Sequence, residues 1–299
     1  MGTKSIISDT GAYMRNYYVK DNSLAVNGIY TAFQRKAESG YLFSGETHDF
    51  WEMMYCIEGS ATVTSGDRVV TLTEDQCIFF RPMEFHSFRV EENVNSLFFI
   101  ISFSAEGEAA KKLGGKIFHL DRELNSRLSA VIDLLDFDSE TSEQENLAQY
   151  FLKKLSSVNG GMNLLINSFE NFLIELSGRD VTKANIPDNS ETKIYTDALR
   201  HIDAHTADSL TVDRLARLCN VSSTYLKKLF RKYNGLGIHR YITKNKISLA
   251  RTMLAEGKPV ASIAEELGFS SSNYFSTVFK REMGISPLEY KSGDFFEYY

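Results

Sequence analysis

An internal repeat in the last hundred residues constrains the fold of this chain more than any other feature. Residues 212–241, VDRLARLCNVSSTYLKKLFRKYNGLGIHRY, match residues 260–290, VASIAEELGFSSSNYFSTVFKREMGISPLEY. Leu215 corresponds to Ile263 at an offset of 48, and the later matched positions lie at an offset of 49. One residue is therefore inserted in the turn of the second copy, and the repeat predicts two copies of one supersecondary unit.

Each copy is predicted to form a helix, a short turn and a second helix. Asn220 in the first copy and Gly268 in the second can adopt the left-handed conformation that a sharp turn needs. Serines follow both residues and are favoured N-caps for the next helix. The second helix of each copy carries apolar residues at helical spacing, which predicts a buried stripe. These stripes are Leu226, Leu229, Phe230 and Tyr233, and Phe275, Val278, Phe279 and Met283.

The opposite face of each second helix has no acidic residue between positions 224 and 232 or between 271 and 281. In the major groove, short polar side chains reach base edges, and Lys or Arg reaches bases or phosphates. For one copy alone, the alternative is that its Ser and Thr residues only cap and solvate a surface helix. The duplication argues against that alternative. The predicted DNA-binding residues are Thr224, Lys227, Lys228, Arg231, Ser272, Asn273, Ser276, Thr277, Lys280 and Arg281.

Charge and spacing agree with a nucleic-acid partner for the C-terminal part. Residues 191–299 carry 16 Lys and Arg against 12 Asp and Glu, whereas residues 1–190 carry 17 against 27. The stretch between the two copies predicts one helix of about 18 residues, hence about 27 Å long. Together with the packing at its two ends, a helix of that length would hold the second helices of the two copies one DNA turn, about 34 Å, apart.

The N-terminal half has a different texture. Strand-like runs fill residues 30–118, with Ser65-Gly66-Asp67 as a hairpin turn, which predicts a β-sandwich or small barrel. Helical periodicity follows His119, and Leu165, Phe169, Phe172 and Leu176 form an apolar stripe there. We expect residues 119–180 to mediate a homodimer through this stripe, with packing on the chain's own barrel as the alternative. Residues 181–192 are polar, contain Pro187 and predict a linker.

Three cysteines at irregular spacing fit neither a disulfide framework nor a zinc site. A reduced, cytoplasmic location is expected, because the first residues of the sequence lack the apolar core of a signal peptide. The most apolar run, LFFIISF, is too short to span a bilayer. No nucleophile elbow, phosphate loop or dinucleotide fingerprint is present. We therefore expect no enzyme activity, no catalytic residues, no cofactor and no membrane partner.

The second copy and its flanks resemble the signature of the AraC/XylS family. The stretch ARTMLAEGKPVASIAEELGFSSSNYFSTVFKREMGISPLEYK matches it, although Lys291 stands where Arg is usual and Met253 where Leu is usual. The resemblance implies a bacterial transcription regulator, acting as an activator, that binds double-stranded operator or promoter DNA. It further implies RNA polymerase as a partner and a homodimeric state. At the matching positions the second copy carries small residues where the family often has an aromatic residue or Arg.

The N-terminal half resembles the cupin-like sensor domain of the same family. HDFWEMMYCIEG is similar to the first cupin motif, through His48, Glu52 and Gly59, and DQCIFFRPMEFH to the second, through Pro82 and His86. The implied architecture is a two-domain chain: an all-β cupin-like barrel (1–118), a helical dimerisation segment (119–180), a linker (181–192), and an all-α DNA-binding domain with two helix-turn-helix motifs (193–299).

The expected ligand of the barrel is a small polar organic molecule such as a sugar. Aromatic residues crowd the motif strands, although strand alternation sends half of them away from any pocket. The expected ligand contacts are His48, Trp51, Glu52, Arg81 and His86, and ligand binding is expected to order residues 1–30.

Two rival functions stay open. Metal cupins carry a second His where this chain has Glu46, so Glu46, His48, Glu52 and His86 are a conceivable metal site, although we expect no metal. The first rival is accordingly a metal-dependent cupin enzyme fused to a DNA-binding domain. The second is an interaction module that uses the repeat to bind protein, and salt-dependent DNA binding separates it from a regulator.

Overall fold

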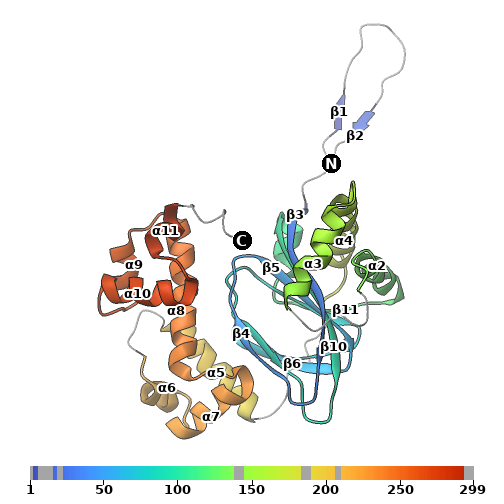
Figure 1. Cartoon of the computed structure of the whole chain (residues 1–299). Helices are drawn as coiled ribbons and strands as arrows, with labels where there is room; N and C mark the ends of the chain where they lie inside the picture. Colours follow the sequence, from blue (N-terminus) through green and yellow to red (C-terminus); the bar gives the residue numbers. More distant parts are fainter. Residues whose placement is uncertain are drawn as a thin grey trace.

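The computed structural model describes residues 3–5, 16–18, 23–137, 145–182, 190–205 and 210–292. These residues form a β-rich barrel with its own helices and, beside it, an all-helical unit built from α5 to α11 (Figure 1). We refer to them as the barrel and the helical unit. The two-domain division expected from the sequence is therefore present in the fold.

The barrel consists of two antiparallel sheets packed face to face. The five-stranded sheet has the order β11-β8-β5-β10-β3, and the four-stranded sheet has the order β4-β9-β6-β7, while β1 and β2 form a separate pair. The strands are β1 (Thr3–Ser5), β2 (Asn16–Tyr18), β3 (Ala25–Ala37), β4 (Leu42–Glu46), β5 (Trp51–Glu58), β6 (Ser60–Ser65), β7 (Arg68–Thr73), β8 (Gln76–Phe80), β9 (His86–Arg89), β10 (Ser96–Glu106) and β11 (Ile117–His119).

Two details of the strands bear on the sequence predictions. The hairpin between β6 and β7 turns at the expected place, where Gly66 has a φ of 55°. Glycine adopts such a positive φ without steric cost. β11 pairs with β8 through Ile117–His119, so the barrel continues just past the expected boundary at residue 118. Most of the N-terminal segment 1–30, which we expected a ligand to order, lies outside the described residues.

The helices of the N-terminal half cover the outer face of the five-stranded sheet (Figure 1). Leu165, Phe169, Phe172 and Leu176 are fully buried within the single chain, and the Phe169 ring packs against Phe103 of β10. Our expectation that this stripe is an exposed dimer surface is wrong, because the chain's own sheet covers it. The homodimer stays a prediction that this stripe does not support. The helices are α1 (Glu108–Leu113), α2 (Arg122–Asp133), α3 (Glu145–Ser156) and α4 (Gly161–Ser177).

The helical unit contains both predicted helix-turn-helix motifs, α6–α7 and α9–α10, joined by α8. Asn220 and Gly268 adopt left-handed φ values of 55° and 64°. Ser222 and Ser271 cap the second helices through their hydroxyls, as predicted for serine at this position. The helices are α5 (Ser190–Ala204), α6 (Val212–Leu218), α7 (Ser223–Asn234), α8 (Ile238–Ala255), α9 (Val260–Glu266), α10 (Ser272–Met283) and α11 (Pro287–Ser292).

Each helix-turn-helix has its own apolar cluster. Phe230 is fully buried in the first cluster, which also contains Val69 and Phe85 of the barrel, and Phe279 is fully buried in the second. The helical unit thus makes its apolar contact with the barrel through its first half. Of the linker expected at 181–192, residues 183–189 lie outside the described part of the chain, and residues 190–192 already belong to α5, so the helical unit begins before the expected boundary at residue 193. No helix among the described residues is long and apolar enough to cross a membrane.

Candidate functional site

A cavity of about 290 Å³ lies between the two sheets of the barrel. It has the size and mixed lining of a small-molecule site, with aromatic walls and a few polar groups. Five strands, β3, β4, β5, β9 and β10, supply most of its walls. The lining residues are Thr31, Phe33, Arg35, Phe43, Glu46, His48, Phe50, Glu52, Met54, Phe80, His86, Phe88, Ile100 and Ser102.

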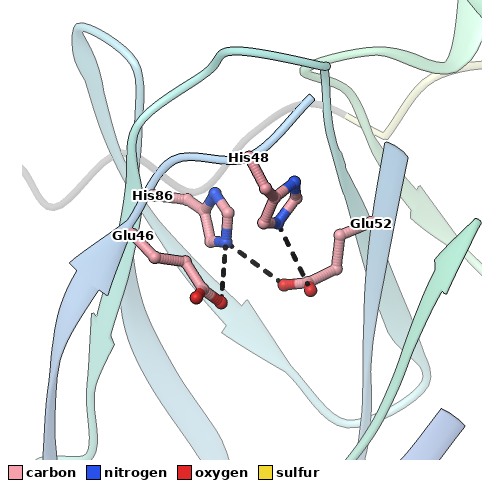
Figure 2. A group of neighbouring side chains, drawn as sticks. All are labelled: Glu46, His48, Glu52 and His86. Atoms are coloured by element: carbon pink, nitrogen blue, oxygen red, sulfur yellow. Dashed lines mark ion pairs between the residues drawn. The ribbon is translucent and has the colours of Figure 1, made fainter. Parts of the chain in front are cut away.

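Four titratable side chains meet at one wall of this cavity and are named here the cavity cluster: Glu46, His48, Glu52 and His86 (Figure 2). The Nε2 atom of His86 lies 3.2 Å from Glu52 and 3.8 Å from Glu46. The Nε2 atom of His48 lies 3.5 Å from Glu52. Three members are buried, and the side chain of Glu46 is 50% exposed.

Neighbouring groups hold the two imidazole rings in fixed orientations. His48 Nδ1 lies 3.0 Å from the Phe50 carbonyl oxygen, and His86 Nδ1 lies 3.1 Å from that of Glu84. A carbonyl oxygen only accepts, so Nδ1 carries a proton in both rings and Nε2 faces the cluster. Each ring also stacks on a phenyl ring, His48 on Phe50 and His86 on Phe80.

Glu52 is the centre of the cluster's electrostatics. Burial alone would raise the pKa of its carboxyl, but the neighbouring imidazoles of His48 and His86 outweigh burial and hold that pKa far below its usual range. Burial likewise opposes the charged form of His86, yet the Glu46 and Glu52 carboxylates raise its pKa to about 10. Ser102 donates a further hydrogen bond of 2.8 Å to Glu52. The cluster therefore stabilises a charged carboxylate inside the barrel.

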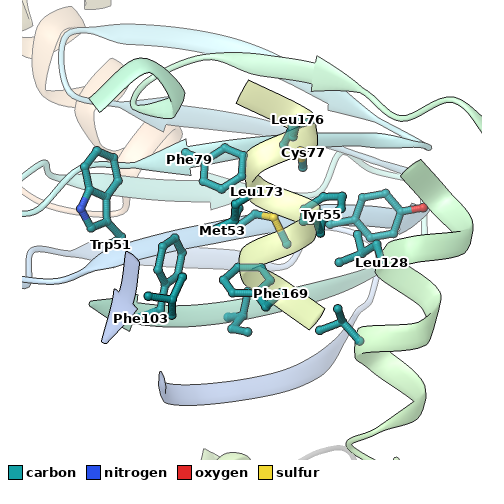
Figure 3. Packing of buried hydrophobic residues seen from close by; sticks show 14 of the residues in the cluster. Trp51, Met53, Tyr55, Cys77, Phe79, Phe103, Leu128, Phe169, Leu173 and Leu176 are labelled. Carbon is teal, nitrogen blue, oxygen red and sulfur yellow. The ribbon is translucent and has the colours of Figure 1, made fainter. Parts of the chain in front are cut away.

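The cavity contains three of the five expected ligand contacts, His48, Glu52 and His86. Trp51 and Arg81 lie elsewhere. Trp51 points from the opposite face of β5 into the apolar layer beneath the helices (Figure 3), and Arg81 donates a hydrogen bond to the Gly114 carbonyl. Successive side chains of a strand point to opposite faces, so Trp51 and Glu52 cannot both enter the cavity.

The same alternation divides the aromatic residues that the sequence singled out. Phe43, Phe50 and Phe80 line the cavity. Trp51, Tyr55 and Phe79 belong to the apolar layer under the helices (Figure 3). Motif reasoning missed the polar groups of β3 and β10, because these strands carry no cupin motif, although Ser102 interrupts an otherwise apolar run. The missed groups are Thr31, Arg35 and Ser102.

The faces predicted to read DNA are accessible on both second helices. On α7, Thr224, Lys227, Lys228 and Arg231 are all exposed. On α10, Asn273, Thr277, Lys280 and Arg281 are exposed, whereas Ser272 and Ser276 are half-buried. Tyr274 on the same helix is 54% exposed and was not among the predicted residues. It gives the second helix a large side chain that the small residues around it lack.

One short segment, residues 45–49, separates the cavity from α8 of the helical unit. Glu46 and His48 line the cavity. The alternate positions face α8: Lys244 donates to the Gly45 carbonyl at 3.0 Å, and Arg251 donates to the Thr47 carbonyl at 3.3 Å and pairs with Asp49 at 3.1 Å. The wall of the cavity is thus also a surface on which the helical unit rests.

Strand β9 and its approach repeat this arrangement. His86 and Phe88 line the cavity. Phe85 packs its ring edge-on against Tyr241 of α8 with ring centres 4.9 Å apart, and the Ser87 hydroxyl donates to the Tyr233 carbonyl at 3.4 Å. Two separate pieces of backbone therefore connect cavity side chains to the helical unit.

Comparisons with known proteins agree with this architecture. Residues 28–153 match the family model "AraC-like ligand binding domain", and residues 215–293 match "Helix-turn-helix domain". Among curated relatives, the regulatory protein PocR of Salmonella typhimurium is 36% identical over 111 residues, which cover 37% of this chain and only 36% of PocR. The Msm operon regulatory protein of Streptococcus mutans is 28% identical over 86% of this chain and 89% of its own length.

A third relative also spans both halves of the chain. The HTH-type transcriptional activator RhaR of Escherichia coli is 22% identical over 84% of this chain and 87% of its own length. The ligand-binding match covers the cavity, and the helix-turn-helix match covers α7 and α10. The chain therefore belongs to the AraC family of transcriptional regulators, which are DNA-binding, ligand-responsive proteins rather than enzymes.

Proposed function

We propose that this chain is a transcription activator in which the docking of the helical unit on the barrel responds to a small polar organic effector of the sugar type. The observation that carries the proposal is the shared wall: residues 45–49 alternate between the cavity and α8. An effector that binds Glu46 and His48 must shift or fix the backbone that Lys244 and Arg251 hold. A ligand changes a conformational equilibrium by binding one state better than the other. Here the two states are the docked and undocked arrangements of the helical unit, and residues 45–49 belong to the contact between the units.

The chemistry of the cavity supports a polar effector that carries hydroxyl groups. Phe33, Phe43 and Phe50 offer apolar ring faces, while Arg35 and the cavity cluster offer donors and acceptors. Ring faces suit the apolar C–H faces of a sugar, and the charged groups suit its hydroxyls. Activation is assigned because RhaR is described as an activator. A cytoplasmic homodimer that contacts promoter DNA and RNA polymerase completes the proposal.

The effector can be tested by calorimetric titration of sugars and related metabolites into the full chain. The wild type is expected to bind one compound per chain, and His48→Ala/His86→Ala is expected to weaken that binding at least tenfold, because two buried hydrogen-bonding groups are lost. His119→Ala is the matched control, since His119 is exposed on β11. An effector that binds the double variant as tightly as the wild type would place the binding site elsewhere.

DNA reading by α7 can be tested with Lys228→Ala on a site selected from random DNA by the full chain. If Lys228 reads a base, the variant is expected to lose about 1–3 kcal/mol on that site and to relax its specificity at one position. If it binds phosphate, the loss should be uniform across sequences and the salt dependence should fall. Lys111→Ala, an exposed lysine of α1, is the control. Unchanged affinity in the Lys228 variant would contradict the assignment.

A further inference from the structure

The geometry points to a metal site: we propose that the cavity cluster binds one divalent transition-metal ion of the zinc, cobalt or iron(II) class. One ligand atom from each of its four residues lies within 4.8 Å of the others. A tetrahedral ion with bonds of about 2.1 Å keeps its ligand atoms about 3.4 Å apart. The distances from Nε2 atoms to carboxylate oxygens are 3.2, 3.5 and 3.8 Å, so only small shifts would be needed.

The two imidazoles turn the nitrogens that a metal would bind toward the two carboxylates. Nε2 of His48 and Nε2 of His86 are buried and face the carboxylates of Glu52 and Glu46 at 3.2 to 3.8 Å, without the geometry of a hydrogen bond. Buried polar atoms that lack a well-formed hydrogen bond are rare in folded proteins and need a physical reason. In both rings Nδ1 faces a backbone carbonyl, the arrangement that orients metal-binding histidines. A metal ion would bridge both Nε2 atoms and the carboxylates, and on His86 it would take the place of the Nε2 proton, which is released.

The donor set selects the class of ion. Two imidazole nitrogens and two carboxylates suit zinc, iron(II), cobalt and similar ions, whereas calcium and magnesium take oxygen ligands. Two carboxylates also balance the charge of a divalent ion. That balance matters because Glu52 is only 7% exposed. A buried charge without compensation is costly.

A second layer of contacts holds the ligands in place. Ser102 donates to Glu52 at 2.8 Å, and Thr31 in turn donates to Ser102 at 2.9 Å. Both imidazoles are stacked on phenyl rings, so their orientation does not depend on the cluster alone. Such outer contacts are characteristic of metal sites, whose ligands are held in orientation by neighbouring groups.

The metal site itself does not depend on the proposed function. Only its consequence for effector binding rests on that function. Glu46 is the one ligand with a half-exposed side chain, so it is the ligand that an incoming oxygen displaces most easily. A sugar hydroxyl or a carboxylate entering the cavity would then coordinate the ion in its place. Because Glu46 also belongs to residues 45–49, that exchange would act on the wall that contacts α8.

The metal site is tested on the full chain after removal of metals with a chelator. We expect calorimetry to give one zinc ion per chain and cobalt(II) to develop the visible absorption of a low-symmetry site. His48→Ala/His86→Ala is expected to lower zinc affinity at least a hundredfold. Glu52→Gln, which keeps the side-chain shape, should lower it strongly as well, and Ser102→Ala should lower it about tenfold as the loss of a positioning residue. Circular dichroism checks that each variant is folded.

A competing site must be excluded, because His201 and His205 lie one turn apart at the end of α5 and could bind metal by themselves. His201→Ala should therefore keep the single tight ion and the cobalt spectrum. Loss of the ion in His201→Ala but not in the cavity variants would overturn the proposal, as would absence of zinc binding by the wild type. Zinc binding in the absence of any effector response would support the metal site and contradict the proposed function, so the two can fail separately.

Discussion

Phe85→Ala is expected to undock the helical unit from the barrel while leaving both folded. The Phe85 residue is 7% exposed, packs against Tyr241 of α8 and belongs to the apolar cluster of the first helix-turn-helix. Removing a buried phenyl ring costs about 3–5 kcal/mol. Because this ring bridges the two units, much of the cost should fall on docking, and about 3 kcal/mol changes the docked-to-undocked ratio more than a hundredfold.

Two measurements check this result. Hydrogen exchange should become faster on the faces of α7 and α8 that contact the barrel, because undocking exposes them, while the buried amides of α10 stay protected. DNA affinity should no longer change when effector is added, since the cavity wall has lost its contact with the helical unit. Phe85→Leu, which retains an apolar side chain in the gap, should give a smaller effect. An effector response that survives Phe85→Ala would show that the signal takes another route.

The repeat shows how much of the fold could be predicted from the sequence. Helical periodicity, capping serines and left-handed turn residues all indicate the same structure, so α7 and α10 are where they were expected, with the expected faces packed inward. The family match over residues 215–293 confirms the helix-turn-helix assignment. Local signals are sufficient here because each motif buries its stripe against its own neighbouring helices.

The side chains that face the barrel cavity were harder to predict from the sequence, for a physical reason visible in β5. Residues 51–56 are buried on both faces, so their apolar pattern does not tell the cavity side from the helix side. The expectation for Trp51 failed at this point, while Glu52 was placed by its motif. The stripe of α4 indicated a covered surface, but periodicity cannot say whether a partner or the chain itself covers it.

The contacts between the two units leave no pattern in the sequence at all. Lys244, Ser248 and Arg251 are polar residues on an amphipathic helix and would ordinarily face solvent. In the structure they bind backbone carbonyls of residues 45, 83 and 47, and Arg251 is only 5% exposed. Backbone acceptors carry no residue signature, so the wall shared by the cavity and α8 becomes visible only in three dimensions.

Phe279→Ala is expected to unfold the second helix-turn-helix and to spare the first. Phe279 is fully buried, and its ring centre lies 5.7 Å from those of Phe275 and Tyr290. The loss of about 3–5 kcal/mol falls on a small, separate apolar cluster that contains no described residue of the barrel. Urea denaturation of the full chain should then show an added early transition, because one unit now unfolds ahead of the rest.

The consequence for DNA follows from the duplication. With α10 unfolded, only α7 can read a major-groove segment, so the footprint on a selected site should shorten by about one helical turn. The dependence of affinity on salt should become less steep, because fewer phosphates are neutralised. Lys280→Ala, an exposed neighbour on α10, is the control: it should weaken DNA binding without a new unfolding transition. A full-length footprint in Phe279→Ala would mean that the second copy does not read DNA, and the case for two reading helices would then fail.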